Sequence, residues 1–210
     1  MSTLLVASSN VQSSERSMLV AMASIGIICA LLIVITYEGT ASTIEKNKIE
    51  ALDKAIFKVI PNISTTMPFQ FNVDQTFSLA TSNISKNPKV YAGYDKNGTL
   101  KGIAITAVGK GYGEVLNLLY GYDPVQQKII GFYVLESKET PGIGDKIEKM
   151  PFLNNFNAME VTLTEDQSKL LNNITTVKQG AKSQSWEIDA ITGATITSRA
   201  VGNILNVSAQ

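Results

Sequence analysis

The stretch Asp189-Ala190-Ile191-Thr192-Gly193-Ala194-Thr195 joins a short strand-like run, residues 187–191, to the last helical pattern of the chain. Apolar residues recur after it at roughly helical spacing: Ile196, Ala200, Val201, Ile204, Leu205 and Val207. Gly193 and Ala194 allow close backbone approach between the two elements. We therefore predict a strand, a tight bend and a helix, with Thr195 at the helix start.

A threonine at a helix start has two possible roles. The first N–H groups of a helix have no intrahelical partners, and the helix dipole favours an anion there by ~0.3–1 kcal/mol. A phosphate can therefore dock on the bend, and the Thr195 hydroxyl can hold a phosphorylated cofactor through an ester bond. The alternative is that Thr192 or Thr195 only caps the helix.

A second motif, Glu139-Thr140-Pro141-Gly142-Ile143-Gly144-Asp145-Lys146-Ile147-Glu148, lies about fifty residues earlier. It resembles the ETPGLGDKIE loop of the G subunit of Rnf electron-transport complexes. The run 189–198, DAITGATITS, resembles the site at which flavin transferases attach FMN, through its phosphate, to a threonine. The resemblance covers nearly the whole chain, from the apolar N-terminal segment to the end.

This resemblance implies a function. The chain would be an electron-carrying subunit of a membrane-bound, ion-translocating ferredoxin:NAD oxidoreductase, with FMN covalently bound to Thr195 as a phosphothreonyl ester. It would belong to a redox-driven ion translocase (EC 7 class), with no catalytic side chain and no metal of its own. Its partners would be the other Rnf subunits, the membrane and, during maturation, a flavin transferase that recognises Asp189.

Two alternatives stay open. The C subunit of the sodium-pumping NADH:quinone reductase shares the attachment motif, although that subunit is usually longer and the 139–148 motif matches the Rnf form better. The chain could also be a membrane-anchored assembly module that carries no flavin.

The resemblance also implies a cofactor site around the two motifs. Its expected members are Thr192, Gly193, Ala194, Glu139, Thr140, Pro141, Gly142, Ile143 and Lys178. Pro141, Gly142 and Gly144 would let backbone approach a flat ring. The alternatives are a structural turn for 139–145 and a solvated surface position for Lys178. Ile143 replaces the more usual Leu, and 111–117, GYGEVLN, departs from the GYSGPI-like run of related subunits.

Composition limits the possible chemistry. The 18 basic and 18 acidic residues cancel, so no basic stripe points to nucleic acid. The chain has no histidine, which removes the usual general base, zinc ligand and haem ligand, and its single Cys29 lies in an apolar segment. Redox chemistry would therefore need a bound cofactor.

The 21 residues from Ser17 to Tyr37 carry no charge and, as a helix, would span roughly 30 Å, the thickness of a bilayer core. We predict one transmembrane helix. A cleaved signal peptide, with Thr40-Ala41-Ser42 as the nearest cleavage-like site, and a buried core helix are the alternatives. The resemblance implies the cell inner membrane, with a cytoplasmic N-terminus and the large domain in the periplasm.

The flanking charges barely indicate the orientation, since Arg16 precedes the helix while Lys46 and Lys48 follow it. Five Asn-x-Ser/Thr sequons, at Asn62, Asn83, Asn97, Asn173 and Asn206, would also suit a eukaryotic type II membrane glycoprotein. We interpret them as chance matches in a chain rich in Asn, Ser and Thr.

The rest of the chain predicts an α+β domain. A helix over 41–60 ends before Pro61, and residues 62–88 are loop-rich with at most one strand. Asp95-Lys96-Asn97-Gly98 joins a hairpin of 89–94 and 100–108, and Gly121-Tyr122-Asp123-Pro124 is the expected turn between 115–120 and 129–135. Short helices are expected at 146–150, 152–159 and 165–172. The predicted parts are a cytoplasmic tail (1–16), a transmembrane helix (17–37), a membrane-proximal helix (38–61) and an extracytoplasmic FMN-binding domain (62–210) with an antiparallel sheet and flanking helices.

Overall fold

The structure, a computed structural model of the whole chain, describes residues 8–72, 76–80 and 89–209. It divides into two compact units, Met1–Glu50 and Ala51–Gln210, which are described separately. The sequon at Asn83 and the first seven residues of the predicted tail lie outside the described residues.

Helix α1 extends over Ser8–Val59. Its residues up to Glu50 belong to the first unit, and its last turns, from Ala51 on, belong to the second. The large apolar side chains between Met18 and Tyr37 are exposed in the isolated chain. The hydroxyls of Ser24, Thr36 and Thr40 donate to carbonyls three or four residues earlier, which satisfies these polar groups within the helix. The helix is long and apolar enough to cross a membrane.

The second unit is built on a seven-stranded sheet in the order β2-β1-β3-β4-β5-β6-β7, with every neighbouring pair antiparallel. The strands are β1 (Thr65–Phe71), β2 (Phe77–Leu79), β3 (Lys89–Tyr94), β4 (Leu100–Lys110), β5 (Val115–Asp123), β6 (Lys128–Glu136) and β7 (Met159–Glu160). A smaller parallel pair is formed by β8 (Thr175–Val177) and β9 (Glu187–Asp189). The expected α+β class with an antiparallel sheet is confirmed.

The predicted hairpin of β3 and β4 is confirmed, together with its turn. Asp95 Oδ1 accepts hydrogen bonds from the N–H groups of Asn97 (2.8 Å) and Thr99 (3.0 Å), and Gly98 has a φ of +78°. Only a residue without a Cβ adopts that φ freely, which explains why Asn-Gly is a reliable local signal here.

The second antiparallel pair is confirmed, but its expected turn at Gly121 is wrong. Strand β5 continues to Asp123, and the turn lies at 124–127, where Asp123 Oδ1 accepts from the N–H groups of Val125 and Gln126. Gly121 instead faces Gly131 of β6 in mid-strand. A Cβ at either position would overlap the Val59 carbonyl oxygen, so these glycines provide room for the end of α1.

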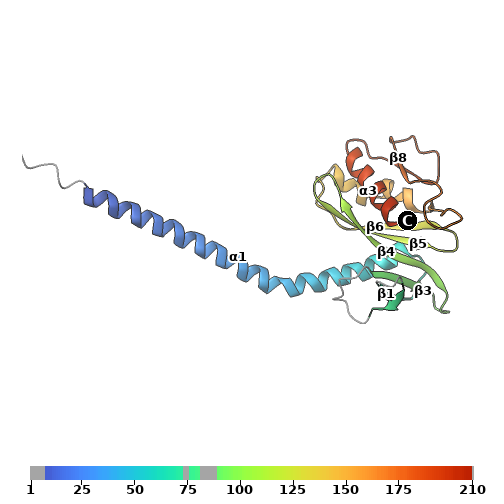
Figure 1. Cartoon of the computed structure of the whole chain (residues 1–210), viewed down its shortest axis with the longest axis horizontal. Coiled ribbons are helices and arrows are strands. Elements are labelled where there is room, and N and C mark those ends of the chain that lie inside the picture. The colour runs from blue at the N-terminus through green and yellow to red at the C-terminus, as the bar shows by residue number, and fades with distance from the viewer. Residues whose placement is uncertain (1–7, 73–75, 81–88, 210) are drawn as a thin grey trace, which may run out of the picture. The chain divides into compact units, whose positions relative to one another are not determined.

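The two faces of the sheet have separate cores. On one face the last turns of α1 bury Ala55, Ile56 and Val59 against Ala104 of β4 and Leu119 of β5. On the other face, helix α3 (Thr195–Ser208) covers β4, where Figure 1 shows it beside β8. This second core includes Leu116, Leu118, Tyr120, Val201 and Leu205, together with a cluster of Phe132, Phe152 and Phe156.

Three expectations for the remaining segments need correction. Residues 62–88 contain two strands within their described part, β1 and β2. The helical segment after Gly144 is made of η1 (Gly144–Glu148), α2 (Met150–Leu153) and η2 (Asn154–Phe156), and Met159 already belongs to a strand. The helix expected over 165–172 is a turn: Asp166 accepts from the hydroxyls of Thr164 and Ser168, and Leu163 bridges to Leu170.

Candidate functional site

The bend between β9 and α3 is held by buried hydrogen bonds. Gly193 has a φ of +87°, and Ala194 is the N-cap residue, without a side-chain cap. The buried Ser198 hydroxyl donates to the Ala194 carbonyl (2.9 Å) and accepts from the Ile191 N–H (3.1 Å). The predicted strand, bend and helix are therefore present, with Thr195 as the first helical residue.

The two threonines of the bend differ in what their hydroxyls do. The side-chain hydroxyl and the N–H of Thr192 both donate to Gln179 Oε1. Thr195 is exposed, and its hydroxyl makes no hydrogen bond to any residue that the structure describes. The capping alternative is wrong for both threonines, because neither side chain caps α3.

The start of α3 has the donors that an anion needs. The first intrahelical hydrogen bond joins the Ser198 N–H to the Ala194 carbonyl. The preceding N–H groups, from Thr195 to Thr197, have no backbone acceptor in the described part of the chain. With the helix dipole, they favour a negative group beside the Thr195 hydroxyl.

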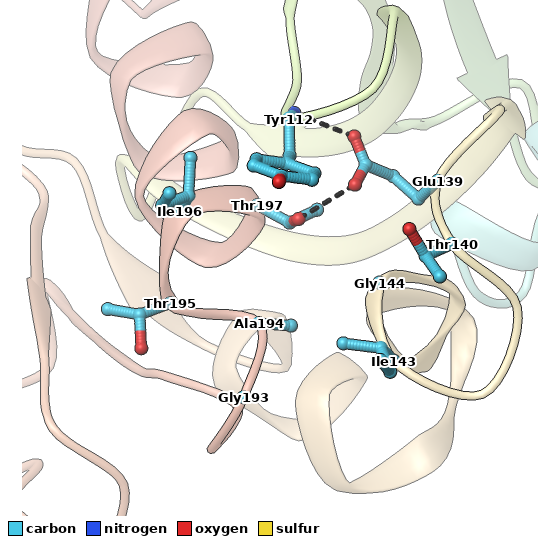
Figure 2. Close-up of a pocket in the computed structure, with 10 residues that line it drawn as sticks. All are labelled: Tyr112, Glu139, Thr140, Ile143, Gly144, Gly193, Ala194, Thr195, Ile196 and Thr197. Atoms are coloured by element: carbon cyan, nitrogen blue, oxygen red, sulfur yellow. Dashed lines mark hydrogen bonds between the residues drawn. The ribbon is translucent and has the colours of Figure 1, made fainter.

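Glu139 ties three segments together from the loop after β6. Glu139 is 7% exposed, and its Oε1 accepts from the N–H groups of Tyr112 (2.8 Å) and Gly113 (3.1 Å). Oε2 accepts from the Thr197 hydroxyl at 2.8 Å, as Figure 2 shows. A Cβ on Gly144 would lie 2.8 Å from Oε2, so the loop can pass this carboxylate only with glycine. The contacts fix Glu139 as part of a rigid wall.

The rest of the 139–145 segment is a tight turn, as the structural alternative expected, and it also lines a cavity. The Thr140 carbonyl accepts from the N–H groups of Ile143 (3.1 Å) and Gly144 (2.9 Å). Pro141 and Gly142 are exposed at the tip, where Gly142 has a φ of +78°. The Ile143 side chain is 47% exposed although it is apolar.

Two cavities meet at Thr195. The first, which we call the Glu139 cavity, has a volume of about 430 Å³ and is lined by Tyr112, Glu139, Thr140, Ile143, Gly144 and residues 193–197. The second, the Lys178 cavity, has a volume of about 680 Å³ and is lined by residues 176–179, Ala181, residues 190–193, Thr195 and Arg199. Gly193 and Thr195 line both.

The two cavities differ in charge. The Glu139 cavity has a buried carboxylate in its wall and no lysine or arginine in its lining. The Lys178 cavity has two cationic side chains, Lys178 and Arg199, and no acidic residue in its lining. The structure therefore brings the predicted site residues together around Thr195 but distributes them between two cavities, with Pro141 and Gly142 in neither lining.

Asn155 holds the strand before the bend and was not expected as a functional residue. It is 5% exposed; its Oδ1 accepts from the Asp189 N–H (2.9 Å), and its Nδ2 donates to the Asp189 carbonyl (3.3 Å). Asp189 Oδ1 in turn accepts from the Gly180 N–H at 2.6 Å. Lys182 Nζ donates to Asn155. Burial of the Lys182 ammonium lowers the Lys182 pKa, and the nearby carboxylates of Asp189 and Glu187 only partly oppose this shift. No sequence signal indicated this contact, because Asn155 lies 34 residues before Asp189.

Arg199 was also missed, although the sequence held a signal for it. It follows Thr195 by four residues, a spacing that places two side chains on one face of a helix. In the structure both line the Lys178 cavity.

Comparison with known proteins shows what this chain is similar to. Residues 111–210 match the FMN-binding domain family, a range that contains both motifs, the 111–114 loop and α3. This match supports FMN as the cofactor. Two solved structures have a similar fold: NqrC of Shewanella oneidensis (TM-score 0.53, 20% identity, covering 75% of this chain and 82% of that one) and the C subunit of the Na(+)-translocating NADH-quinone reductase of Parabacteroides distasonis (TM-score 0.55, 21% identity, covering 70% and 74%).

The sequence relatives are more specific. The G subunit of the ion-translocating oxidoreductase complex of Methanosarcina acetivorans is 28% identical over 91% of this chain and 94% of its own length. The G subunit of the proton-translocating ferredoxin:NAD(+) oxidoreductase complex of Clostridium ljungdahlii is 36% identical over 53% of this chain and 52% of its own. The predicted resemblance to the G subunit of the Rnf complexes is confirmed, and the relatives' names support a role as a subunit of a redox complex.

The site fits FMN by its own chemistry. A phosphate needs donors and positive charge, which the start of α3, Lys178 and Arg199 provide. A flat aromatic ring needs an apolar slot with few polar groups, and the Glu139 cavity has a volume within the usual range for ligand sites. Among the described residues, no three His, Cys, Asp or Glu side chains gather as metal ligands would.

Proposed function

We propose that this chain is the G subunit of a membrane-bound Rnf complex and relays electrons through FMN esterified to Thr195. The observation that carries the proposal is the exposed, unbonded hydroxyl of Thr195 at the first position of α3, between two cavities. Thr192 is a poorer candidate, because its hydroxyl already donates to Gln179.

Attachment would be a phosphoryl transfer. The Thr195 oxygen forms a bond to the FMN phosphorus and loses its proton to a base of the transferase. The phosphoanhydride bond of a flavin dinucleotide donor breaks, and a nucleoside monophosphate leaves. In this proposal the transferase recognises Asp189, whose backbone N–H and carbonyl are both hydrogen-bonded to Asn155.

When bound, FMN supplies one- and two-electron transfer; the chain supplies position and surroundings. The N–H groups of the first turn of α3 and the cations of the Lys178 cavity would hold the phosphodiester. Glu139 fixes the loop after β6 against α3, so that the cavity walls keep their spacing. No acid–base side chain is needed.

The anchor and the compartment complete the proposal. We place residues 17–37 of α1 across the cell inner membrane and the FMN-binding domain on its periplasmic side. The exposed apolar surface of α1 supports a membrane anchor. Covalent attachment suits that side, because a dissociated FMN would be lost to a compartment that does not replace it. The protein would act with the other Rnf subunits as a redox-driven translocase (EC 7 class).

Coexpression of the full chain with a flavin transferase tests the attachment. We expect a fluorescent band in a denaturing gel for the wild type and for Thr192→Ala, and a dark band for Thr195→Ala. Thr192→Ala tests the other hydroxyl of the bend, three residues away, and Thr99→Ala, which lines neither cavity, is the control and should keep its fluorescent band. A dark wild-type band would support the assembly-module alternative, and a fluorescent Thr195→Ala band would move the ester to another residue.

A further inference from the structure

The charges on the two sides of Thr195 indicate how FMN would lie, an inference that rests on the proposed function. A phosphodiester carries a negative charge and would be repelled by the buried carboxylate of Glu139. It would be attracted by Lys178 and Arg199, which line the cavity on the other side. Figure 2 shows the Thr195 side chain pointing away from Glu139 and Thr197. The phosphate end therefore belongs in the Lys178 cavity and the ring in the Glu139 cavity.

The Glu139 cavity has apolar side chains where a ring would need them. Tyr112 is 62% exposed, Ile196 58% and Ile143 47%, and all three line this cavity. Figure 2 draws all three side chains among the residues that line this cavity. Exposed apolar groups around a concave site indicate a surface that a ligand covers.

The loop that carries Tyr112 is unusually well held for an exposed segment. The N–H groups of Tyr112 and Gly113 donate to Glu139. The Gly111 N–H donates to the Glu114 carbonyl at 2.7 Å. Glu114 also pairs with Lys138 at 2.7 Å. A Cβ on Gly111 would overlap Glu139 Oε1, and one on Gly113 would lie 2.9 Å from the Lys138 carbonyl oxygen. The loop therefore presents Tyr112 from a fixed backbone.

We infer that Tyr112 stacks on the isoalloxazine ring of FMN in the Glu139 cavity and shields it from water, with Ile143 on the other side of the ring. An aromatic side chain suits this role because it offers a large flat surface, and its backbone is already ordered before the ring arrives. The loop Tyr112–Glu114 then has a function in the site, and Glu139 positions it.

Time-resolved flavin fluorescence of the full, FMN-loaded protein tests this contact. A tyrosine in van der Waals contact donates an electron to the light-excited ring and takes it back, so emission is lost without net chemistry. We expect Tyr112→Phe, which keeps the shape but not the electron donor, to lengthen the fluorescence lifetime severalfold. Tyr94→Phe in β3, which lines neither cavity, should leave the lifetime unchanged.

A second variant tests the shielding. Tyr112→Ala should raise quenching of the flavin emission by iodide severalfold, because the ring becomes open to water. Unchanged lifetime in Tyr112→Phe together with unchanged iodide quenching in Tyr112→Ala, in protein whose mass includes FMN, would overturn the stacking inference alone. Wild-type protein without bound FMN would overturn the proposed function, and the stacking inference with it.

Discussion

The two faces of the sheet are each covered by a helix, but the helices are used differently. On one face the end of α1 lies against strand backbone at Gly121 and Gly131, where not even a Cβ would fit. On the other face the Ile204 side chain of α3 lies against Gly109 of β4, where a Cβ would overlap it, and α3 leaves its first turn open beside two cavities. Both contacts use glycine, but α1 meets the strands with its backbone, whereas α3 meets β4 with a side chain and keeps backbone donors free for a ligand.

The sheet face covered by the end of α1, which we call the closed face, should be more sensitive to added side-chain volume than the face covered by α3, the open face. We expect Gly121→Val to lower the free energy of unfolding by about 3 kcal/mol, because its Cβ would meet the Val59 carbonyl. Denaturant unfolding of the full chain in detergent micelles measures this. Gly39→Ala is the control: its Cβ meets no atom within 4 Å, so stability should hold or rise slightly. A Gly121→Val protein as stable as the wild type would contradict the close contact.

On the open face the strongest effect should come from Glu139. Glu139→Ala leaves two N–H groups and one hydroxyl without their acceptor, at a cost of about 1–3 kcal/mol for each that stays buried. The melting temperature and the amount of attached FMN should both fall. Glu114→Ala removes only an exposed ion pair of the same loop and should leave the stability nearly unchanged. Equal effects of the two variants on stability and attached FMN would contradict a positioning role for Glu139.

The cations of the Lys178 cavity should matter less, and mainly for attachment. Lys178→Ala and Arg199→Ala should each slow FMN transfer to Thr195 about three- to tenfold, because each removes one charge near an incoming phosphate. The effect should shrink at high salt, and Arg199→Lys should keep most of the rate. Transfer rates measured with purified transferase test this. Transfer rates that do not change in either variant would favour the alternative that Lys178 is a solvated surface residue with no role in attachment.

The smallest expected effect is acid sensitivity, which arises away from both helices. Hydrogen bonds lower the pKa values of Asp95, Glu187 and Asp166, the last to about 2. Their contribution to stability is full above the ordinary carboxyl pKa of about 4 and is lost as pH falls through the lowered values. Melting temperatures between pH 7 and 2 should fall below pH 4. Asp166→Asn should flatten the decline, and an unchanged slope would exclude Asp166 as a source.

Local signals predicted much of this fold, and long-range contacts explain the errors. Asn97-Gly98 marked a turn correctly because its preference is built into the backbone. The turn expected at Gly121 is wrong, because the Val59 contact that requires glycine there comes from a residue 62 positions earlier in the chain. The pattern over 165–172 suited a helix, but side-chain bonds to Asp166 stabilise a turn.

The site shows the same division. The bend with Thr195 and the 139–145 loop were predicted from their motifs, and the cavity linings bring most of these residues together. Asn155 and the Tyr112–Glu139 contact could not be predicted, since each joins segments 27 or more residues apart through one side chain. Arg199 could have been predicted from its helical spacing to Thr195.

The most direct test of the account is a tandem mass spectrum of the tryptic peptide 183–199 from protein coexpressed with a flavin transferase. Around the bend this peptide contains Thr192, Thr195, Thr197 and Ser198, and fragmentation distinguishes their hydroxyls. The account predicts a mass increase of one FMN less one water, located on Thr195. An unmodified peptide, or the added mass on any other residue, would contradict it.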